Sequence, residues 1–283
     1  MGRIRIIGTA ALGTCLLLAV AVPSAVADAD TSGPVLKLPP SAQFVTGTTI
    51  GDSTGPFGDS PQTPAIHQLV SWSATDASGI CGYDVFKIYN GFAPQKVVSN
   101  SLATSYADLT TDYDDQQGGG SYKVRAWKIV ARDCAGNTTT ASTRVLPVVT
   151  QENGLTYGYR GVSITYAGSW AKATCKCWSG DHDQWTATAG ASATLRRTWA
   201  GGDQAALVME KAPNRGALAV YVDGVRWATV DTNSSTGTHR AVVWSGRMSA
   251  GDHAITLVNL ATPGHPRIDL DAVLTNAKGY CNC

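Results

Sequence analysis

The stretch LAVYVDGVRWATV, residues 218–230, decides the fold class of this chain. Its first half places Leu218, Val220 and Val222 at every second position, which is the period of a strand with one buried face. Asp223-Gly224 follows, and both residues tolerate the positive φ that a two-residue hairpin turn requires. The second half is again rich in β-favouring residues. The stretch therefore predicts a β-hairpin, and a chain built mainly from strands.

The same signals recur along most of the sequence. Val70, Trp72 and Ala74 alternate with polar residues, and Asn90-Gly91 ends another run of strand-forming residues. Glycine is abundant, at 30 residues, and Glu152 and Glu210 are the only glutamates, so long helices are disfavoured. We expect strands near residues 70–75, 83–89, 122–132, 138–148, 218–222, 225–230, 240–244, 254–260 and 268–273. The predicted fold class is all-β, with two β-sandwich domains.

The first 27 residues have the features of a secretory signal peptide. Arg3 and Arg5 precede an apolar run over residues 6–22, and Ala25-Val26-Ala27 forms a small-x-small cleavage site. A retained membrane anchor is the alternative. No later apolar run is long enough to span a bilayer, so we expect a secreted, extracellular protein with no membrane span in the mature chain.

Six cysteines follow the expected cleavage site, and an even number in an exported chain indicates disulfides. We expect one bridge between Cys81 and Cys134. Two more would join the pair Cys175-x-Cys177 to the pair Cys281-x-Cys283, with the pairing between them left open. A four-sulfur zinc site is the alternative, although its usual spacing is C-x2-C.

Residues 28–40 are expected to form a flexible lead, and residues 41–149 the first sandwich. The segments Trp72–Asp76, Ser78–Tyr83 and Asp133–Asn137 resemble bacterial immunoglobulin-like and fibronectin III-like modules. The resemblance implies that Cys81 begins the third strand and Cys134 ends the sixth. These strands would be neighbours in one sheet.

Residues 150–158 are expected to be a linker, within a stretch from Leu146 that contains Pro147, Asn153 and Gly154. Residues 159–283 are expected to form a jelly roll. This part is similar to galactose-binding-like jelly-roll modules of secreted bacterial proteins, which often but not always bind sugar. The similarity lies in residues 190–194, 213–216, 220–224, 250–253 and 268–272.

Charge and motifs exclude several function classes. Lys and Arg number 22 against 21 Asp and Glu, so no basic field favours nucleic acid. Two Gly-Asp-Ser runs, residues 51–53 and 58–60, resemble the start of GDSL esterases, but no Asp-x-x-His follows. Turns are the simpler interpretation. We expect no cofactor. Calcium at Asp112, Asp114 and Asp115 is a weaker alternative, because no Glu closes the loop as in an EF-hand.

Tryptophan supplies the candidate site. Six of the eight tryptophans lie in the second domain, and flat apolar rings stack on sugars. Trp227 and Trp244 lie in predicted strands and are expected to be packed. Trp178 and Trp185 flank a polar loop and are expected to be exposed. The predicted ligand-binding residues are Trp178, Asp181, His182, Asp183 and Trp185.

Within that loop, His182 lies between two carboxylates. They could raise its pKa or share a metal ion with it, although a solvated loop is the simpler interpretation. On the predicted strand 268–273, Asp269 and Asp271 share one face. They could face solvent, bind calcium or pair with Arg.

The sequence thus predicts a non-catalytic protein whose partner is a carbohydrate or cell-surface polysaccharide. One alternative is a protein-interaction or inhibitor module that binds another secreted protein through loops or edge strands of the first domain. The other is an extracellular hydrolase whose site has no recognised motif.

Overall fold

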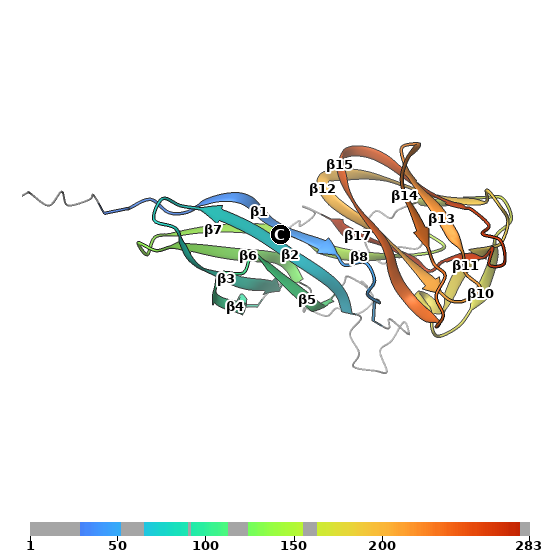
Figure 1. The fold of residues 1–283 in the computed structure, drawn as a ribbon, viewed down its shortest axis with the longest axis horizontal. Coiled ribbons are helices and arrows are strands. Elements are labelled where there is room, and N and C mark those ends of the chain that lie inside the picture. The colour runs from blue at the N-terminus through green and yellow to red at the C-terminus, as the bar shows by residue number, and fades with distance from the viewer. Residues whose placement is uncertain (1–28, 52–64, 90–91, 113–123, 155–162, 278–283) are drawn as a thin grey trace, which may run out of the picture.

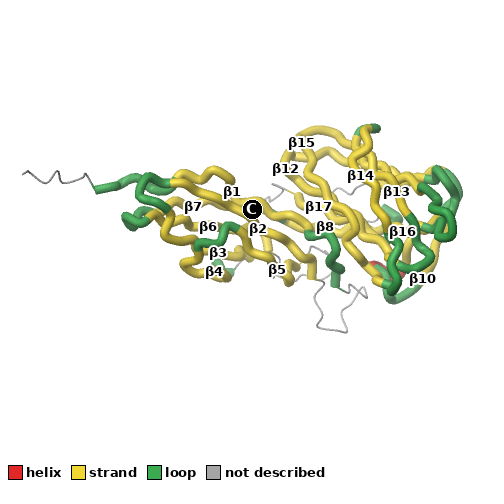
Figure 2. Tube along the Cα trace, viewed as in Figure 1, coloured by secondary structure: helices red, strands yellow, loops and turns green. Residues whose placement is uncertain are grey.

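The computed structural model describes residues 29–51, 65–89, 92–112, 124–154 and 163–277. Strands dominate these residues, and the one helical element is the 3-10 turn η1, Ser179–Asp181 (Figure 2). The predicted all-β class is confirmed. The expected signal peptide lies outside the described residues. Among those described, no helix has the length and apolar character needed to span a bilayer.

Two antiparallel sheets form the first sandwich (Figure 1). One sheet has the order β1-β2-β5, with bounds Val35–Phe44, Ala65–Thr75 and Ser105–Asp112. The other has the order β4-β3-β6-β7, with bounds Gln95–Ser101, Ile80–Tyr89, Val124–Asp133 and Thr138–Arg144. Val70, Trp72, Val85 and Trp127 fill the space between the sheets. The predicted alternation at residues 70–74 therefore marks a real core face.

The expected flexible lead is wrong in its second half. Strand β1 begins at Val35 and pairs with β2 from Val35↔Thr75 onward. Leu36 packs against the first core, which explains why this segment is a strand.

The second sandwich is organised by two long strands, β12 (Ser192–Lys211) and β15 (Thr238–Asn259). The first part of β12 pairs with β9 (Ser163–Ala167), and the last part of β15 pairs with β13 (Ala217–Val222). Strand β13 pairs in turn with β14 (Val225–Asp231). The second part of β12 pairs with β17 (Ala272–Ala277), which pairs in turn with β8 (Leu146–Gln151). Residues from both parts of β12 and of β15 lie in one hydrophobic core, so each of these long strands contributes to both layers of the sandwich.

A small sheet closes the end of this sandwich away from the first one (Figure 1). Its order is β10-β11-β16, with bounds Ala171–Thr174, His182–Thr186 and Ile268–Leu270. This sheet and the turn η1 carry the candidate site.

The expected linker is wrong in its first part. Residues up to Gln151 belong to β8, so Val145 alone separates the last strand of the first sandwich from the first strand of the second. Val148 and Val149 are buried, which favours the strand. Pro147 is tolerated because β8 is an edge strand.

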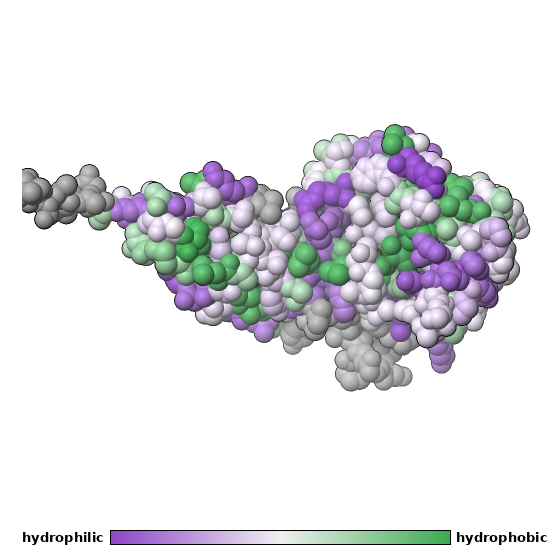
Figure 3. Space-filling model, in the orientation of Figure 1, coloured by the Kyte–Doolittle hydropathy of each residue, from purple (hydrophilic) through white to green (hydrophobic). Residues whose placement is uncertain are grey.

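The two sandwiches share a third core cluster. Phe44, Ile50 and Ile66 of the first part pack against the β8-β17-β12-β15 layer. The Phe44 amide donates to Gln204 Oε1 at 2.9 Å, and the Gly47 amide donates to the Val242 carbonyl at 2.8 Å. The first sandwich therefore covers that layer, and the exposed surfaces of the second sandwich lie elsewhere. On the face shown in Figure 3, hydrophilic and hydrophobic residues are interspersed over both parts.

Candidate functional site

Disulfides support an extracellular protein. Cys81, near the start of β3, is bonded to Cys134, directly after β6, which is the expected pairing between neighbouring strands. The expected clasp between the two C-x-C pairs is not what the structure has. Cys175 is bonded to Cys177, whose Cα lies 5.1 Å away across a tight turn, within disulfide reach. Cys281 and Cys283 lie outside the described residues.

The five predicted ligand-binding residues share one segment, from the turn after β10 to the end of β11. They do not share one environment. Trp178 is 8% exposed, and its indole N–H donates to Glu210 Oε2 at 2.9 Å. The expectation of an exposed Trp178 ring is wrong, because a buried carboxylate satisfies its polar N–H inside the fold.

Trp185 is only partly buried and lies on β11, opposite Asp269 of β16. The guanidinium carbon of Arg267 lies 4.4 Å from the centre of the Trp185 ring. Arg267 in turn donates to Asp269 Oδ1, from Nε at 2.9 Å and from Nη2 at 2.5 Å. A cation held between an aromatic face and a buried carboxylate has a fixed position.

The three polar residues of the predicted site diverge. Asp181 is partly exposed and has a φ of 66°, in the left-handed region. The His182 side chain is 30% exposed, and its Nδ1 lies 3.6 Å from Glu152 Oε1. Asp183 points inward and has no exposed surface. Of the three, only Asp181 and His182 are in a position to meet a ligand at the surface.

Behind this surface lies a buried charged cluster, which we define as Glu152, Asp183, Glu210, Arg215, Asp269 and Asp271. Arg215 forms an ion pair with Asp269 through Nε and lies 4.0 Å from Glu210. His239 Nδ1 lies 2.5 Å from Glu210 Oε2. Asp271 accepts a hydrogen bond from the Ser179 amide at 2.8 Å.

The sequence contained partial signals of this cluster. The alternation at residues 268–271 placed two carboxylates on one face, and for Asp269 the structure selects pairing with arginine. Glu152 and Glu210, the only glutamates of the chain, both belong to the cluster. Their rarity was the signal that sequence reasoning did not use. Arg215 and Arg267 face each other in an isolated parallel β-bridge outside the named strands. Arg215 lies in the segment 213–216 that carries the jelly-roll resemblance, but no local pattern predicted a role for either arginine.

Burial is the first cause of the shifted pKa values here. It raises the pKa of Glu152 to about 7, although the nearby backbone and Lys172 oppose the shift. Burial, then the adjacent Asp269 carboxyl, raises the pKa of Asp183 to about 9. Asp271 is also raised well above its ordinary pKa by burial. Burial lowers the pKa of His182, with Lys172 acting in the same direction.

Asp183 and Asp271 can therefore retain protons at neutral pH, while Asp269 pairs with Arg215 inside the cluster and with Arg267 in front of it. On the outward side of the cluster lie the Trp185 ring, the Arg267 guanidinium and the His182 imidazole. Such a set can stack on an apolar face and donate hydrogen bonds to hydroxyl or carboxylate oxygens.

Two other sequence expectations concern different places. Trp227 was expected to be packed, but it is 49% exposed on β14, an edge strand, whereas Trp244 is 7% exposed. The possible calcium ligands Asp114 and Asp115 lie outside the described residues, as does nearly all of the Gly-Asp-Ser region.

No known protein family matches the sequence, and no curated protein matches it. Solved structures do show similarity. The CBM36-1 domain of a multidomain xylanase from the hindgut metagenome of Trinervitermes trinervoides is 14% identical, covering 47% of this chain and 98% of that one, with a TM-score of 0.35. CBM35 from Cellvibrio japonicus Abf62 is 14% identical, covering 48% of this chain and 99% of that one, with a TM-score of 0.33.

The catalytic domain of Agl-KA is 12% identical. That match covers 48% of this chain and 28% of the other, with a TM-score of 0.34. The similarities to CBM35 and CBM36 are thus similarities to carbohydrate-binding modules at low identity.

Proposed function

We propose that this is a secreted, non-catalytic protein that binds polysaccharide through the end of its second sandwich. The ligand surface consists of Trp185, Arg267, His182 and Asp181. Trp185 offers its ring to a sugar face, while Arg267 and His182 offer donors to sugar oxygens.

One observation carries the proposal: Arg267 is held between the Trp185 ring and the Asp269 carboxylate. An unrestrained arginine loses considerable side-chain entropy when it binds a ligand. For Arg267 this side-chain entropy has already been lost when the protein folds. A fixed donor beside a partly exposed ring suits a ligand that combines apolar C–H faces with oriented hydroxyls, as pyranose sugars do.

The test is retention on a panel of insoluble and soluble polysaccharides, by pull-down and affinity electrophoresis. Trp185→Ala is expected to weaken binding by about tenfold or more, the scale of a hot-spot aromatic. Arg267→Lys keeps the charge but loses the planar fork, so weaker binding is expected here too. Trp227→Ala is the matched control, an equally large truncation on another surface. Binding that survives both site variants but is lost in Trp227→Ala would move the site to β14.

A second candidate function has its own observation. Val225 and Trp227 are 64% and 49% exposed on the edge strand β14, an arrangement suited to pairing with a protein strand. Co-precipitation with other secreted proteins that is abolished by Trp227→Ala, without any polysaccharide retention by the parent chain, would favour this function over the first.

A further inference from the structure

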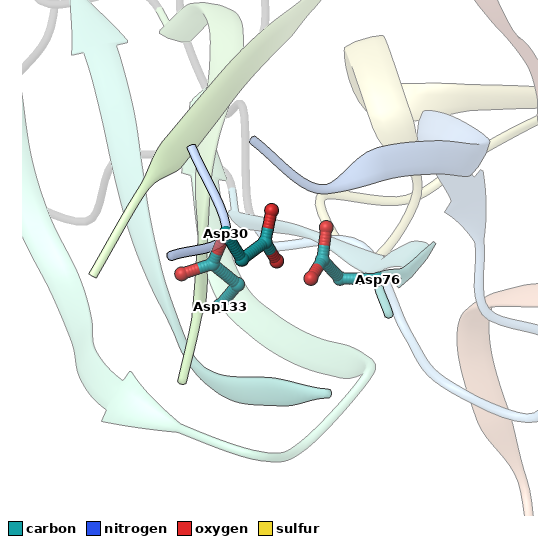
Figure 4. Close-up of side chains that lie close together, drawn as sticks. All are labelled: Asp30, Asp76 and Asp133. Atoms are coloured by element: carbon teal, nitrogen blue, oxygen red, sulfur yellow. The ribbon is translucent and has the colours of Figure 1, made fainter. Parts of the chain in front are cut away.

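Two groups of polar side chains lie outside the proposed sugar surface. In the first group, Asp30, Asp76 and Asp133 point toward one another (Figure 4). Each of these carboxylates accepts hydrogen bonds from a serine or an asparagine of its own turn, so the turns account for this group. The second group lies where β15 passes the turn between β13 and β14, and its geometry is that of a reactive site.

A serine, a histidine and an aspartate form a chain of hydrogen bonds in the second group. Ser249 Oγ lies 2.9 Å from His253 Nε2, and His253 Nδ1 lies 2.6 Å from Asp223 Oδ2. Ser249 and His253 belong to β15, and Asp223 begins the turn after β13. The two nitrogens of one imidazole therefore join a hydroxyl to a carboxylate, which is the order of groups in a Ser-His-Asp triad.

Backbone contacts fix Asp223 in place. Its amide donates to the Ala254 carbonyl at 2.9 Å, and its Oδ1 accepts from the Ala254 amide at 2.9 Å. The hydrogen bond from that amide, followed by the one from His253, holds the pKa of Asp223 below its ordinary value. Asp223 is therefore a carboxylate at neutral pH, and its second oxygen, Oδ2, holds the imidazole.

This carboxylate determines which ring nitrogen of His253 carries the proton. An ionised aspartate can only accept hydrogen bonds, so Nδ1 must donate to Asp223. In the neutral imidazole Nε2 is then the acceptor, and the Ser249 hydroxyl donates to it at 2.9 Å. The His253 side chain is 15% exposed, whereas Ser249 is open to solvent. His253 can thus take the proton of an accessible serine, as a general base does.

A bend in β15 brings Ser249 and His253 together. Residues four apart on a straight strand are separated by about 13 Å, which is too far for these two side chains to meet. Gly251 lies between them with a φ of 121°, and the bulge at Gly201-Gly202 of β12 lies opposite Ser249. Bulges often re-aim a side chain beside an active site. The two residues opposite Ser249 have no side chain that could cover its hydroxyl.

A cation is available on the same face of the strand. Exposed, buried and exposed residues alternate at Arg247, Met248 and Ser249, so Arg247 and Ser249 share a face of β15. Successive residues on one face lie roughly 7 Å apart, a distance that an arginine side chain can span. Within the described ranges, no hydrogen bond or ion pair engages the Arg247 side chain. It can therefore stabilise the negative charge that forms on an acyl oxygen when Ser249 attacks.

We propose that Ser249, His253 and Asp223 form a hydrolytic site for carboxylic esters with a small acyl group. Ser249 Oγ attacks the ester carbonyl carbon while His253 Nε2 takes the hydroxyl proton, and Arg247 stabilises the oxyanion. The C–O bond to the alcohol then breaks, and the alcohol leaves with the proton from His253. Water attacks the acyl-serine, His253 passes the proton of this water to Ser249, and the carboxylic acid is released.

The openness of the site limits the substrate. Ser249 is exposed and the strand opposite offers it only glycine backbone, so β12 gives no wall for a long acyl chain. A short acyl group, carried by an alcohol that lies against the surface, fits such a site. This inference goes beyond polysaccharide binding, because the sugar surface proposed above performs no reaction and shares no strand or turn with the triad.

The first experiment is covalent labelling. A fluorophosphonate forms a bond to an activated serine oxygen with loss of fluoride, and peptide mass spectrometry locates the label. The parent chain should be labelled at Ser249, and Ser249→Ala should lose this label. Ser142→Ala, which changes an exposed serine on β7, is the matched control and should be labelled like the parent. Circular dichroism checks that both variants are folded.

The second experiment is hydrolysis of p-nitrophenyl acetate and p-nitrophenyl octanoate. For the parent chain and Ser142→Ala, kcat/KM should be about tenfold or more higher for the acetate ester, since the site offers no wall for the longer chain. Ser249→Ala should hydrolyse the acetate ester about 100-fold or more slowly. A preference for the octanoate ester would contradict the small-acyl specificity.

Asp223 acts through His253 and is a positioning residue, which Asp223→Asn tests. The Asn oxygen can still accept from the Ala254 amide, but its NH2 group would donate to His253 Nδ1. Nε2 would then carry the proton and could not accept from Ser249. We expect kcat to fall by about 100-fold or more with KM unchanged, a split that general loosening of the fold would not produce.

Two results would overturn the proposal. One is a parent chain that the fluorophosphonate does not label at Ser249. The other is hydrolysis of p-nitrophenyl acetate that is equally fast in the parent and in Ser249→Ala. Polysaccharide retention should be the same in these two proteins, so failure of the triad can be told apart from failure of the sugar surface.

Discussion

At the scale of single residues, Glu152 is the most informative group. It has no exposed surface, and the ionisable side chain recorded beside it is that of His182, whose Nδ1 lies 3.6 Å from Glu152 Oε1. Burial raises its pKa to about 7 from an ordinary 4.5. The folded protein therefore holds this proton over a pH range in which the unfolded chain has released it.

Glu152 should make the protein less stable as pH rises. Between about pH 4.5 and pH 7 the folded state binds more protons, so the free energy of unfolding falls over this window and levels off above it. Glu152→Gln should remove about 2–3 kcal/mol of that fall. Asp183 adds a fall of the same sign, up to about pH 9.

Urea denaturation in EDTA at pH 5 and pH 8 measures this effect, because the chelator prevents a bound cation from masking it. Asp231→Asn serves as an exposed control and should follow the parent chain. If Glu152→Gln and the parent lost the same stability between the two pH values, the buried carboxylate would not be the cause.

The tryptophans show what sequence predicts at this scale. Their concentration in the second domain is visible in the sequence, and Trp244 is packed as expected. The exposures of Trp178 and Trp227 were reversed, because each depends on a distant contact. Glu210 gives the Trp178 N–H a partner, whereas Trp227 lies on β14, which is the outermost strand of its sheet among the described residues. Neither fact is written in the local pattern.

At the scale of elements, the short turns follow local chemistry and the long strands do not. Asp223-Gly224 adopts φ values of 50° and 79° between β13 and β14, as the hairpin signal predicted. By contrast, two separate strands were expected at residues 240–244 and 254–260, yet the single strand β15 runs through both and through Ala250-Gly251-Asp252 between them. Ala200 pairs with Ala250 beside the bulge at Gly201-Gly202, so β12 and β15 bend together.

Two alanine substitutions distinguish this bend from the simple hairpin turn. Gly201 has a φ of 87°, and a Cβ there would lie 3.3 Å from the Ala250 Cβ, whereas a Cβ on Gly224 would meet nothing within 4 Å. Gly224→Ala should cost about 1 kcal/mol for the left-handed backbone alone, and Gly201→Ala about 2–3 kcal/mol. Chemical denaturation measures both, and equal losses would show that the bend tolerates a side chain.

At the scale of the whole molecule, the shared core cluster is the feature that sequence could not predict. Phe44, Ile50 and Ile66 read as ordinary residues of the first domain. Their partners are in β8, β12, β15 and β17, and no local periodicity reports a contact across two domains. The sequence therefore predicts two sandwiches, but not that they are joined by a common apolar layer.

This layer should make the two sandwiches unfold together. Phe44 is 3% exposed, and Phe44→Ala should cost about 3–5 kcal/mol and split one calorimetric transition into two. Val70→Ala, a truncation inside the first core, should lower the transition temperature without splitting it. Two separate transitions in the parent chain would show that the sandwiches are energetically independent.

The shared layer also determines how the molecule can be used. The blue segment that leads into β1 and the β10–β11 hairpin lie toward opposite ends of the long axis (Figure 1). Because a hydrophobic cluster and backbone hydrogen bonds join the two sandwiches, they are not independent domains on a free linker. The ligand surface proposed at the β10–β11 end is therefore separated from the start of β1 by the combined length of the two sandwiches.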